Sequence, residues 1–210
     1  MPRWEQVRAT EGSVHIWRAD LARIGDRPAQ LLCQEELARA ARILPERKRV
    51  VWARSRGVLR ALLGRYLDRD PRTLRFVLGP HGKPALLRDD TESVEDLRFN
   101  LSHSGSLALY AVTVGRAVGI DVEVSRPRVN ELAVAERMLG GLSSQARARG
   151  LLRAWVTHEA TVKCLGVGLA TPPKGPHPDD PWTAELDVGP PAAAAVAVAG
   201  GPCELRCYRW

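Results

Sequence analysis

The chain has 210 residues, of which 45% are hydrophobic, enough for one packed domain or two small ones and too many for a disordered chain. Its net charge of +7 at pH 7 favours an acidic or phosphorylated partner. No apolar run approaches the ~20 residues of a membrane span, and the N-terminus has no apolar signal core, so we expect a cytoplasmic protein. The cysteines form no metal-binding pair and are expected to be buried free thiols: Cys33, Cys164, Cys203 and Cys207.

The first part of the chain predicts a strand, two helices and a further strand. Residues 13–21 (SVHIWRADL) alternate between apolar and polar, which is typical of a strand. Helices are predicted over residues 29–43 and 46–67, and a second alternating segment at 73–79 ends in the turn GPHGKP at 79–84. The second helix carries one apolar stripe, formed by Leu59, Leu62, Leu63 and Tyr66.

The remaining sequence predicts more strands, then helices, then strands again. Residues 97–125 indicate three short strands, broken at Gly105 and near Gly115. Helices are predicted near 130–139 and over 143–165, and two or three strands follow in the tail. This order predicts an α+β fold with two similar halves. The predicted halves are residues 1–108 and 109–210.

Two carboxylates project together from the segment VGIDVEV. Residues two apart on a strand face the same side, so Asp121 and Glu123 point one way while Ile120 and Val122 face the core. Neighbouring carboxylates repel each other unless a cation lies between them, and oxygen-only ligands favour Mg²⁺ over zinc. Taken alone, the pair is more typical of a solvent-facing strand.

A second polar group lies in NLSHS. Asn100, Ser102 and Ser104 share one face of a strand, and His103 lies on the other. Hydroxyl and imidazole groups suit phosphate oxygens, so anion binding is the functional alternative to a plain polar strand end. The turn GPHGKP has the same two interpretations, since its glycines expose N–H groups and Lys83 adds a charge.

The segment WVTHEATVK adds a third group of polar side chains. On a helix, Glu159 and Lys163 lie one turn apart, with His158 beside Glu159. A Glu–Lys pair at this spacing commonly stabilises an exposed helix, so the segment alone does not distinguish a surface ion pair from one wall of a site. Lysine is rare in this chain, which favours a specific role for each one.

In their order and spacing, GKP, NLSHS, GIDVE and W-x-x-H-E-A-x-x-K resemble the motifs of the 4′-phosphopantetheinyl transferases of the surfactin-synthetase-activating (Sfp) type. The resemblance covers most of the chain, including VHIWRADL and SRGVLRALLGRYL. It implies a pseudo-twofold pair of α+β halves, usually a monomer, with the active site in the cleft between them. It also implies transfer of the 4′-phosphopantetheine arm of coenzyme A to a serine of an acyl or peptidyl carrier protein, with release of 3′,5′-ADP, as in polyketide or nonribosomal peptide biosynthesis.

The resemblance also implies the roles of individual residues. Asp121, Glu123 and Glu159 would hold Mg²⁺ against the pyrophosphate of coenzyme A. Glu159, Lys163 and Asp121 would be the catalytic groups, with Glu159 the candidate to accept the proton of the attacking serine. The contacts with coenzyme A would come from Gly82, Lys83, Pro84, Ser102, His103, His158 and Lys163.

Two positions depart from the family pattern. His158 stands where the family usually has lysine, and a neutral imidazole brings less charge to a pyrophosphate although it can donate one hydrogen bond. Val51 stands where many members carry an arginine for the 3′-phosphate of coenzyme A, which leaves Arg49 and Arg54 as alternatives.

Two other functional classes compete with the transferase. A non-catalytic relative that binds coenzyme A or a carrier protein remains open because of His158. A basic nucleic-acid-binding protein rests on charge alone, without a recognisable module or a row of stacking aromatic residues. Because carrier proteins of this kind are acidic, a net charge of +7 suits a carrier partner, and we expect neither nucleic acid nor membrane.

Overall fold

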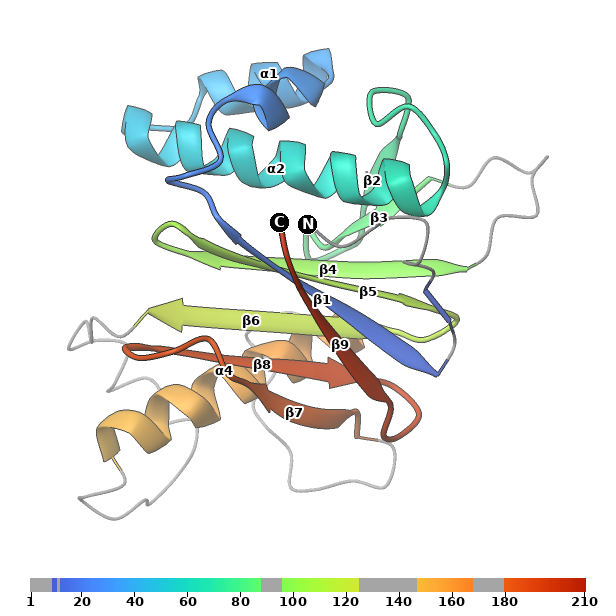
Figure 1. The fold of residues 1–210 in the computed structure, drawn as a ribbon, viewed down its shortest axis with the longest axis vertical. Helices are drawn as coiled ribbons and strands as arrows, with labels where there is room; N and C mark the ends of the chain where they lie inside the picture. The colour runs from blue at the N-terminus through green and yellow to red at the C-terminus, as the bar shows by residue number, and fades with distance from the viewer. Residues whose placement is uncertain (1–8, 11, 88–95, 125–146, 168–179) are drawn as a thin grey trace.

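Four layers make up the fold in this computed structural model, which describes residues 9–10, 12–87, 96–124, 147–167 and 180–210. Helix α2 (Glu46–Tyr66) covers one face of a four-stranded sheet. The other face of that sheet packs on a three-stranded sheet, which helix α4 (Arg147–Leu165) covers in turn (Figure 1). The predicted α+β class is confirmed. The pseudo-twofold relation and the boundary after residue 108 stay predictions.

The four-stranded sheet combines strands from both ends of the chain, in the order β4–β5–β1–β9. Strand β5 pairs antiparallel with β4 and with β1, whereas β9 pairs parallel with β1, placing Glu204 opposite Ser13. The strand predicted at 13–21 is confirmed as β1. The bounds are β1 (Ser13–Asp20), β4 (Leu97–Ser104), β5 (Leu107–Val114) and β9 (Glu204–Arg209).

The three-stranded sheet is antiparallel throughout, in the order β6–β8–β7. Its strands are β6 (Val118–Val124), β7 (Trp182–Leu186) and β8 (Ala192–Val198). Strand β8 separates two cores because its side chains alternate: Val196 and Val198 face the larger sheet, whereas Ala195 and Ala197 face α4. The small alanine side chains let the helix lie close to the sheet.

The first predicted helix is divided in two. A short 3₁₀ helix, η2 (Arg27–Leu31), precedes α1 (Gln34–Ala41), because Leu32 and Cys33 have extended backbone angles. Cys33 is the residue that caps α1, and its N–H donates to the Glu36 carboxylate one turn later. The predicted second helix is confirmed as α2.

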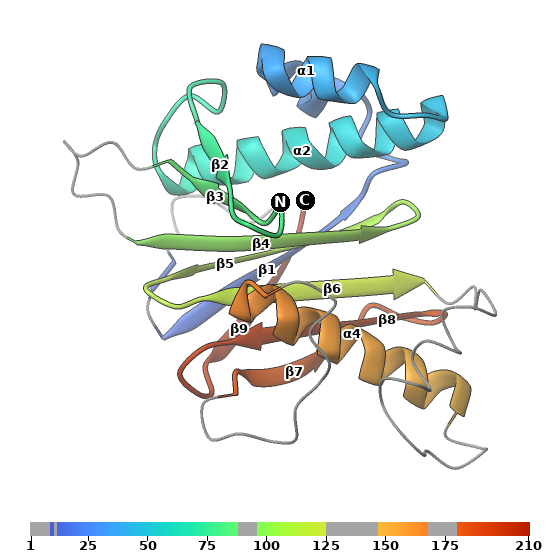
Figure 2. The same cartoon turned by 180° about the vertical axis from the view of Figure 1, so that it is seen from behind.

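A small hairpin projects beside α2. Strands β2 (Phe76–Leu78) and β3 (Pro84–Leu86) pair around the predicted GPHGKP turn (Figure 2). Gly82 has a φ of 77°, a left-handed conformation that glycine adopts without steric cost. Strand β3 was not predicted from the sequence. The helix predicted near 130–139 and the start of that predicted over 143–165 lie outside the described residues.

The larger core lies between α2 and the four-stranded sheet. The stripe residues Leu59, Leu62 and Leu63 are fully buried there against Trp17 and Tyr110. None of the helices in the described ranges is long and apolar enough to cross a membrane. The four cysteines are free, but only Cys164 is buried, so the expectation of buried thiols is wrong for the other three. Cys207, the exposed one, lies on β9, an edge strand.

A buried histidine belongs to this core. The hydroxyl of Tyr66 lies 2.7 Å from Nδ1 of His15 and accepts a hydrogen bond from Trp17 Nε1 at 2.8 Å. Nε2 of His15 has no hydrogen-bond partner among the described residues. Burial lowers the pKa of His15 to about 4, with repulsion from Arg206 adding to the effect and Glu204 opposing it. The imidazole is therefore neutral in the folded protein near pH 7.

We predict that His15 makes the protein less stable in mild acid. The unfolded chain binds a proton at His15 below pH 6.5, whereas the folded chain binds it only near pH 4. The stability that comes from a neutral His15 is therefore present above pH 6.5 and is lost as the pH falls through the folded pKa. The loss in unfolding free energy should reach about 2–3 kcal/mol. Urea unfolding of wild-type and His15→Gln protein between pH 7 and pH 4 measures it. Parallel curves for the two proteins would contradict the prediction.

Candidate active site

Strands β4 and β6 meet where the two sheets pack together, and side chains of β4 link them in place of a backbone ladder. Oδ1 of Asn100 accepts a hydrogen bond from the N–H of Ile120 at 2.8 Å. The hydroxyl of Ser102 donates to Oδ1 of Asp121 at 2.7 Å. The alternation of β4 places these side chains on one face, as the sequence pattern predicted, and in the structure that face meets β6.

A second serine repeats the arrangement one step along both strands. The Ser104 hydroxyl donates to Oε2 of Glu123 at 2.7 Å and accepts from the N–H of Val124 at 3.1 Å. Each of the two predicted carboxylates on β6 is therefore oriented by a serine of NLSHS. The two motifs, about twenty residues apart in sequence, form one polar seam.

Helix α4 places a lysine and a third carboxylate at this seam. Nζ of Lys163 lies 2.5 Å from Oδ1 of Asp121 and 4.0 Å from Oε2 of Glu159. Asp121 is 3% exposed and Glu159 is 6% exposed. Burial raises the pKa of Glu159 to about 7, with the charges of Asp121 and Glu123 adding to the rise and Lys163 opposing it. The structure thus places Lys163 beside Asp121 and Glu159, and Glu123 lies near enough for its charge to act on Glu159. The catalytic and metal-binding roles of these residues stay predictions.

The donor set suits a hard divalent cation in its chemistry. All three carboxylates supply oxygen, and Oδ2 of Asp121 is buried without a hydrogen-bond partner among the described residues. Burial is the main cause of the raised pKa of Glu159, and the negative charges of Asp121 and Glu123 add to it; a bound cation would offset that added charge. Within the described residues, however, no group of three aspartate, glutamate, histidine or cysteine side chains lies close enough together to hold a metal ion. Lys163 instead contacts Asp121.

The helix reaches the seam because β6 has a glycine beneath it. A Cβ added to Gly119 would lie 2.0 Å from the carbonyl oxygen of Ala160 and 2.4 Å from the backbone nitrogen of Cys164. Both are backbone atoms of α4, so any larger residue would displace the helix. The glycine of GIDVE therefore sets the distance between Lys163 and Asp121.

Lys83 holds the same helix from the hairpin. Its ammonium donates to the carbonyl of Lys163 at 2.6 Å and to that of Val118 at 3.0 Å. The first is one of the terminal carbonyls of α4, which have no partner within the helix, and a cation there also suits the helix dipole. Lys83 lines a pocket of about 420 Å³ beside the hairpin. Its predicted contact with coenzyme A stays a prediction.

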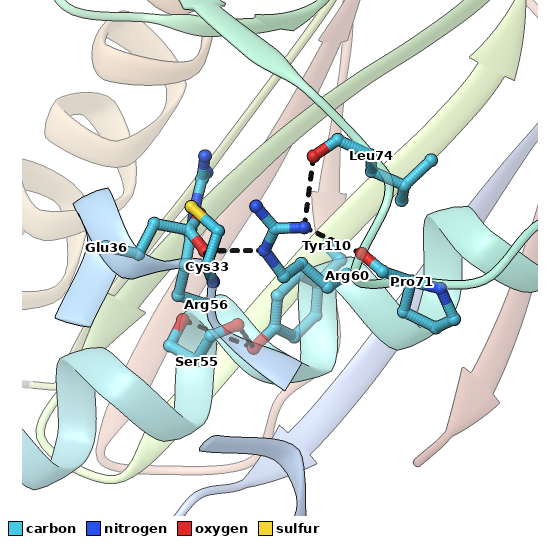
Figure 3. A network of polar contacts seen from close by, with 8 residues as sticks. All are labelled: Cys33, Glu36, Ser55, Arg56, Arg60, Pro71, Leu74 and Tyr110. Carbon is cyan, nitrogen blue, oxygen red and sulfur yellow. Dashed lines mark hydrogen bonds and ion pairs between the residues drawn. The ribbon is translucent and has the colours of Figure 1, made fainter. Parts of the chain in front are cut away.

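A basic groove of about 760 Å³ lies on the other face of β4, between α1, α2 and the hairpin. Three of the predicted site residues line it: Gly82, Pro84 and His103. Its positive charge comes from Arg39, Arg56, Arg60, Arg72 and Arg75, and its aromatic side chains are Trp52 and Phe76. Figure 3 shows Arg56 and Arg60 converging on Glu36 of α1.

His103 connects the groove with the seam. It follows Ser102 on β4, so the two side chains point apart, one into the groove and the other to Asp121. Burial lowers the pKa of His103, and the charge of Lys163 lowers it further. Strand β4 therefore lies between the groove on one of its faces and the carboxylates on the other.

His158 is half-buried on α4. Its ring centroid lies 6.3 Å from that of Trp155, and Nε2 is buried without a hydrogen-bond partner among the described residues. Burial lowers its pKa, which favours the neutral imidazole. The neutral imidazole of His158 can therefore donate or accept a hydrogen bond through Nε2. It carries no positive charge, unlike the lysine usual in the family.

Neither arginine suggested by the sequence for the 3′-phosphate of coenzyme A lies in the groove. Arg49 is paired with Glu46, and Arg54 with Asp26, and neither lines the groove. Arg56 is one of the arginines that do line it. The signal was present in helical spacing, because Trp52, Arg56 and Arg60 recur every four residues and so lie along one side of α2.

Known proteins of one enzyme family are similar in sequence to this chain. A family model described as 4′-phosphopantetheinyl transferase, N-terminal, matches residues 17–115. The 4′-phosphopantetheinyl transferase HetI of Nostoc sp. is 36% identical over 186 residues, covering 81% of this chain and 76% of that protein. A putative 4′-phosphopantetheinyl transferase of Synechocystis sp. is 31% identical over 148 residues, 67% of this chain and 59% of the other. The transferase AcpT of Salmonella typhimurium is 36% identical over 115 residues, 51% and 56% of the two chains.

The chain belongs to the 4′-phosphopantetheinyl transferase family. It is a transferase enzyme, and the adaptor and nucleic-acid alternatives have no support in these relatives.

We predict that Gly119→Ala will weaken both the fold and the enzyme. The added methyl group has no room against the α4 backbone, so the helix must move away from Asp121. Such overpacking should cost about 1–3 kcal/mol of unfolding free energy. Urea unfolding and transfer activity measure the two effects. Gly12→Ala is the matched control, since its Cβ would meet nothing within 4 Å; equal behaviour of the two variants would contradict the role of Gly119.

A second substitution tests the contact of the hairpin with α4. Lys83→Met keeps the apolar stem but leaves the carbonyls of Val118 and Lys163 without their donor. Unfolding free energy should fall by about 1–3 kcal/mol. Lys48→Met, at an exposed position of α2, should change it by less than about 0.5 kcal/mol. If the two variants were equally stable, the hydrogen bonds of Lys83 would contribute nothing to the fold.

Proposed function

We propose that the enzyme is of the Sfp type and transfers the 4′-phosphopantetheine arm of coenzyme A, with Mg²⁺, to a serine of an acyl or peptidyl carrier protein, releasing 3′,5′-ADP. One observation carries this proposal: strand β4 has an arginine-lined groove on one face and three carboxylates with a lysine on the other, and consecutive residues, His103 and Ser102, contact the two. Coenzyme A has two separated anionic groups, the pyrophosphate and the 3′-phosphate. A site with two separate anion-binding parts suits such a molecule.

The nucleotide end of coenzyme A would occupy the basic groove. Gly82 and Pro84 bring the hairpin backbone to its wall, and Phe76 and Trp52 offer aromatic surface for an adenine ring. His103 lies toward the carboxylates and would meet a phosphate between the two parts. The predicted contacts of Ser102, His158 and Lys83 with coenzyme A remain part of the proposal.

The carboxylates would hold the metal ion. Asp121, Glu123 and Glu159 would provide the ligands, and the buried Oδ2 of Asp121 is the ligand atom best prepared for the role. When bound, Mg²⁺ neutralises charge on the pyrophosphate and on the leaving phosphate. The serines of β4 would keep the carboxylates oriented whether or not substrate is present.

The transfer itself is a displacement at phosphorus. The carrier serine oxygen forms a bond to the phosphorus of the phosphopantetheine arm, and the bond from that phosphorus to the oxygen of 3′,5′-ADP breaks. Glu159 would accept the serine proton, and Lys163 would stabilise the charge that develops on the phosphate oxygens. Both groups lie on one face of α4, one turn apart, so a single helix positions them.

The partner follows from the charge. An enzyme with a net charge of +7 attracts an acidic carrier protein over a long range and raises the rate of encounter. The attraction weakens as salt screens it, so the KM for the carrier should rise with ionic strength. We propose a monomer acting on a carrier in the cytoplasm.

Intact-mass spectrometry tests this function. Purified enzyme, coenzyme A and Mg²⁺ should add one phosphopantetheine group to an apo carrier protein from a panel of acyl and peptidyl carriers. Asp121→Asn keeps the side-chain shape but removes the charge, and should lower the rate by more than about 100-fold. Glu204→Gln, an exposed carboxylate of β9, is the control and should not change it. No mass shift on any carrier, or undiminished transfer after chelation of Mg²⁺, would refute the proposal.

A further inference from the structure

We propose that Glu36, a residue of α1 outside every motif, is a positioning residue that fixes Arg56 as the receptor for the second anionic group of the substrate, the 3′-phosphate of coenzyme A. This inference rests on the proposed function, because it assumes that the nucleotide end occupies the groove. It assigns to α1 a part in selecting the substrate.

Glu36 divides its two oxygens between two arginines. Oε1 accepts a hydrogen bond from Nε of Arg56 at 2.5 Å, and Oε2 accepts one from Nε of Arg60 at 2.5 Å (Figure 3). The backbone N–H of Cys33 adds a third, to Oε2 at 3.2 Å. Because that N–H lies at the start of α1, the carboxylate is fixed by its own helix before it contacts α2.

The two arginines differ in how many of their N–H donors are already used. Arg60 is 1% exposed and also donates to the carbonyls of Pro71 and Leu74, so it holds the loop after α2. Arg56 has a side chain 13% exposed, and within the described part of the chain its hydrogen bonds involve Nε alone. Its terminal nitrogens therefore keep their donors for a ligand in the groove.

Two contacts set the orientation of Arg56. Its guanidinium carbon lies 4.1 Å from the centroid of the Phe76 ring, which fixes the plane of the group. The bond from Nε to Glu36 fixes its rotation in that plane. A guanidinium held in this way presents a planar pair of donors, the geometry that binds phosphate with two parallel hydrogen bonds.

Glu36 also makes the close approach of two cations tolerable. Burial and the charges of Arg60 and Arg39 lower the pKa of Arg56, and the carboxylate opposes them. Guanidinium groups do not lose their proton in proteins, so removing Glu36 would leave Arg56 charged but misdirected. The expected defect is thus a loss of recognition of one phosphate, with the chemistry at Asp121 intact.

Binding of two nucleotides that differ in this phosphate alone tests the assignment. Adenosine 3′,5′-bisphosphate and 5′-AMP are titrated calorimetrically into the purified protein. Glu36→Gln should raise the Kd of the bisphosphate about tenfold and that of 5′-AMP less than about twofold. Glu36→Asp keeps the charge on a shorter side chain and should raise the Kd of the bisphosphate less than Glu36→Gln does. If Glu36→Gln does not fold, the Kd values of the two nucleotides are compared in Glu36→Asp.

Two further variants separate positioning from general stabilisation. Arg56→Ala should cause a loss of the same kind, and Glu36→Gln should add little to it in the double variant, because both act through one group. Asp26→Asn is the matched control. It removes the carboxylate partner of Arg54, which lies on α2 like Arg56 but does not line the groove, and it should leave both Kd values unchanged. Equal weakening of both nucleotides, additive losses, or an equal effect of Asp26→Asn would overturn the inference.

Catalysis provides a separate readout. In Glu36→Gln the KM for coenzyme A should rise about tenfold with kcat within about threefold, and the KM for 3′-dephospho-coenzyme A should stay near the wild-type value. A fall in kcat with unchanged KM would overturn the role of Glu36. If wild-type enzyme modified no carrier, the proposed function would fail, while nucleotide binding would still decide the role of Glu36.

Discussion

The site depends on how two edge strands meet without pairing. Strands β4 and β6 face each other with side chains between them, so the backbone groups on the inner edge of β6 need other partners. Asn100 and Ser104 satisfy two N–H groups, and the ammonium groups of Lys83 and Lys163 approach two carbonyls. A backbone ladder would have brought the strands to about 4.8 Å and left no room for these groups. The seam therefore gathers serines, carboxylates and lysines in one place.

The second constraint is the close approach of α4 to the smaller sheet. The alanines of β8 and Gly119 of β6 remove the side chains that would otherwise hold a helix further away. Burial of the helix on this surface also buries Glu159, which raises its pKa, while Lys163 supplies the nearest compensating charge. Packing and electrostatics are therefore coupled: the small residues that fix the helix also create the charged environment of the site.

Local patterns predicted much of the architecture and part of the site. Period-two and helical patterns located β1, β4, β5, β6 and α2. The alternation within NLSHS and within GIDVE gave each strand its polar face, but neither pattern showed that Ser102 meets Asp121. The extended backbone at Cys33, which ends one helix and begins another, has no comparable signal. Nor did the sequence indicate the destination of Lys83, because a lysine in a turn can reach many partners. The contacts of Glu36 could not be predicted either, because they depend on how α1 packs against α2.

The parallel pairing of β9 with β1 has a consequence for folding during synthesis. Strand β5 covers one edge of β1 once residue 114 has emerged, but the other edge waits for β9, whose first residue is Glu204. At ribosomal speeds of roughly 5–20 residues per second, that delay is on the order of ten seconds. Throughout it, β1 offers an unpaired edge, and Trp17 lacks the ring of Tyr208 that stacks on it at 4.6 Å. The nascent chain thus passes through a period in which a second copy or a chaperone competes for the place of its own final strand.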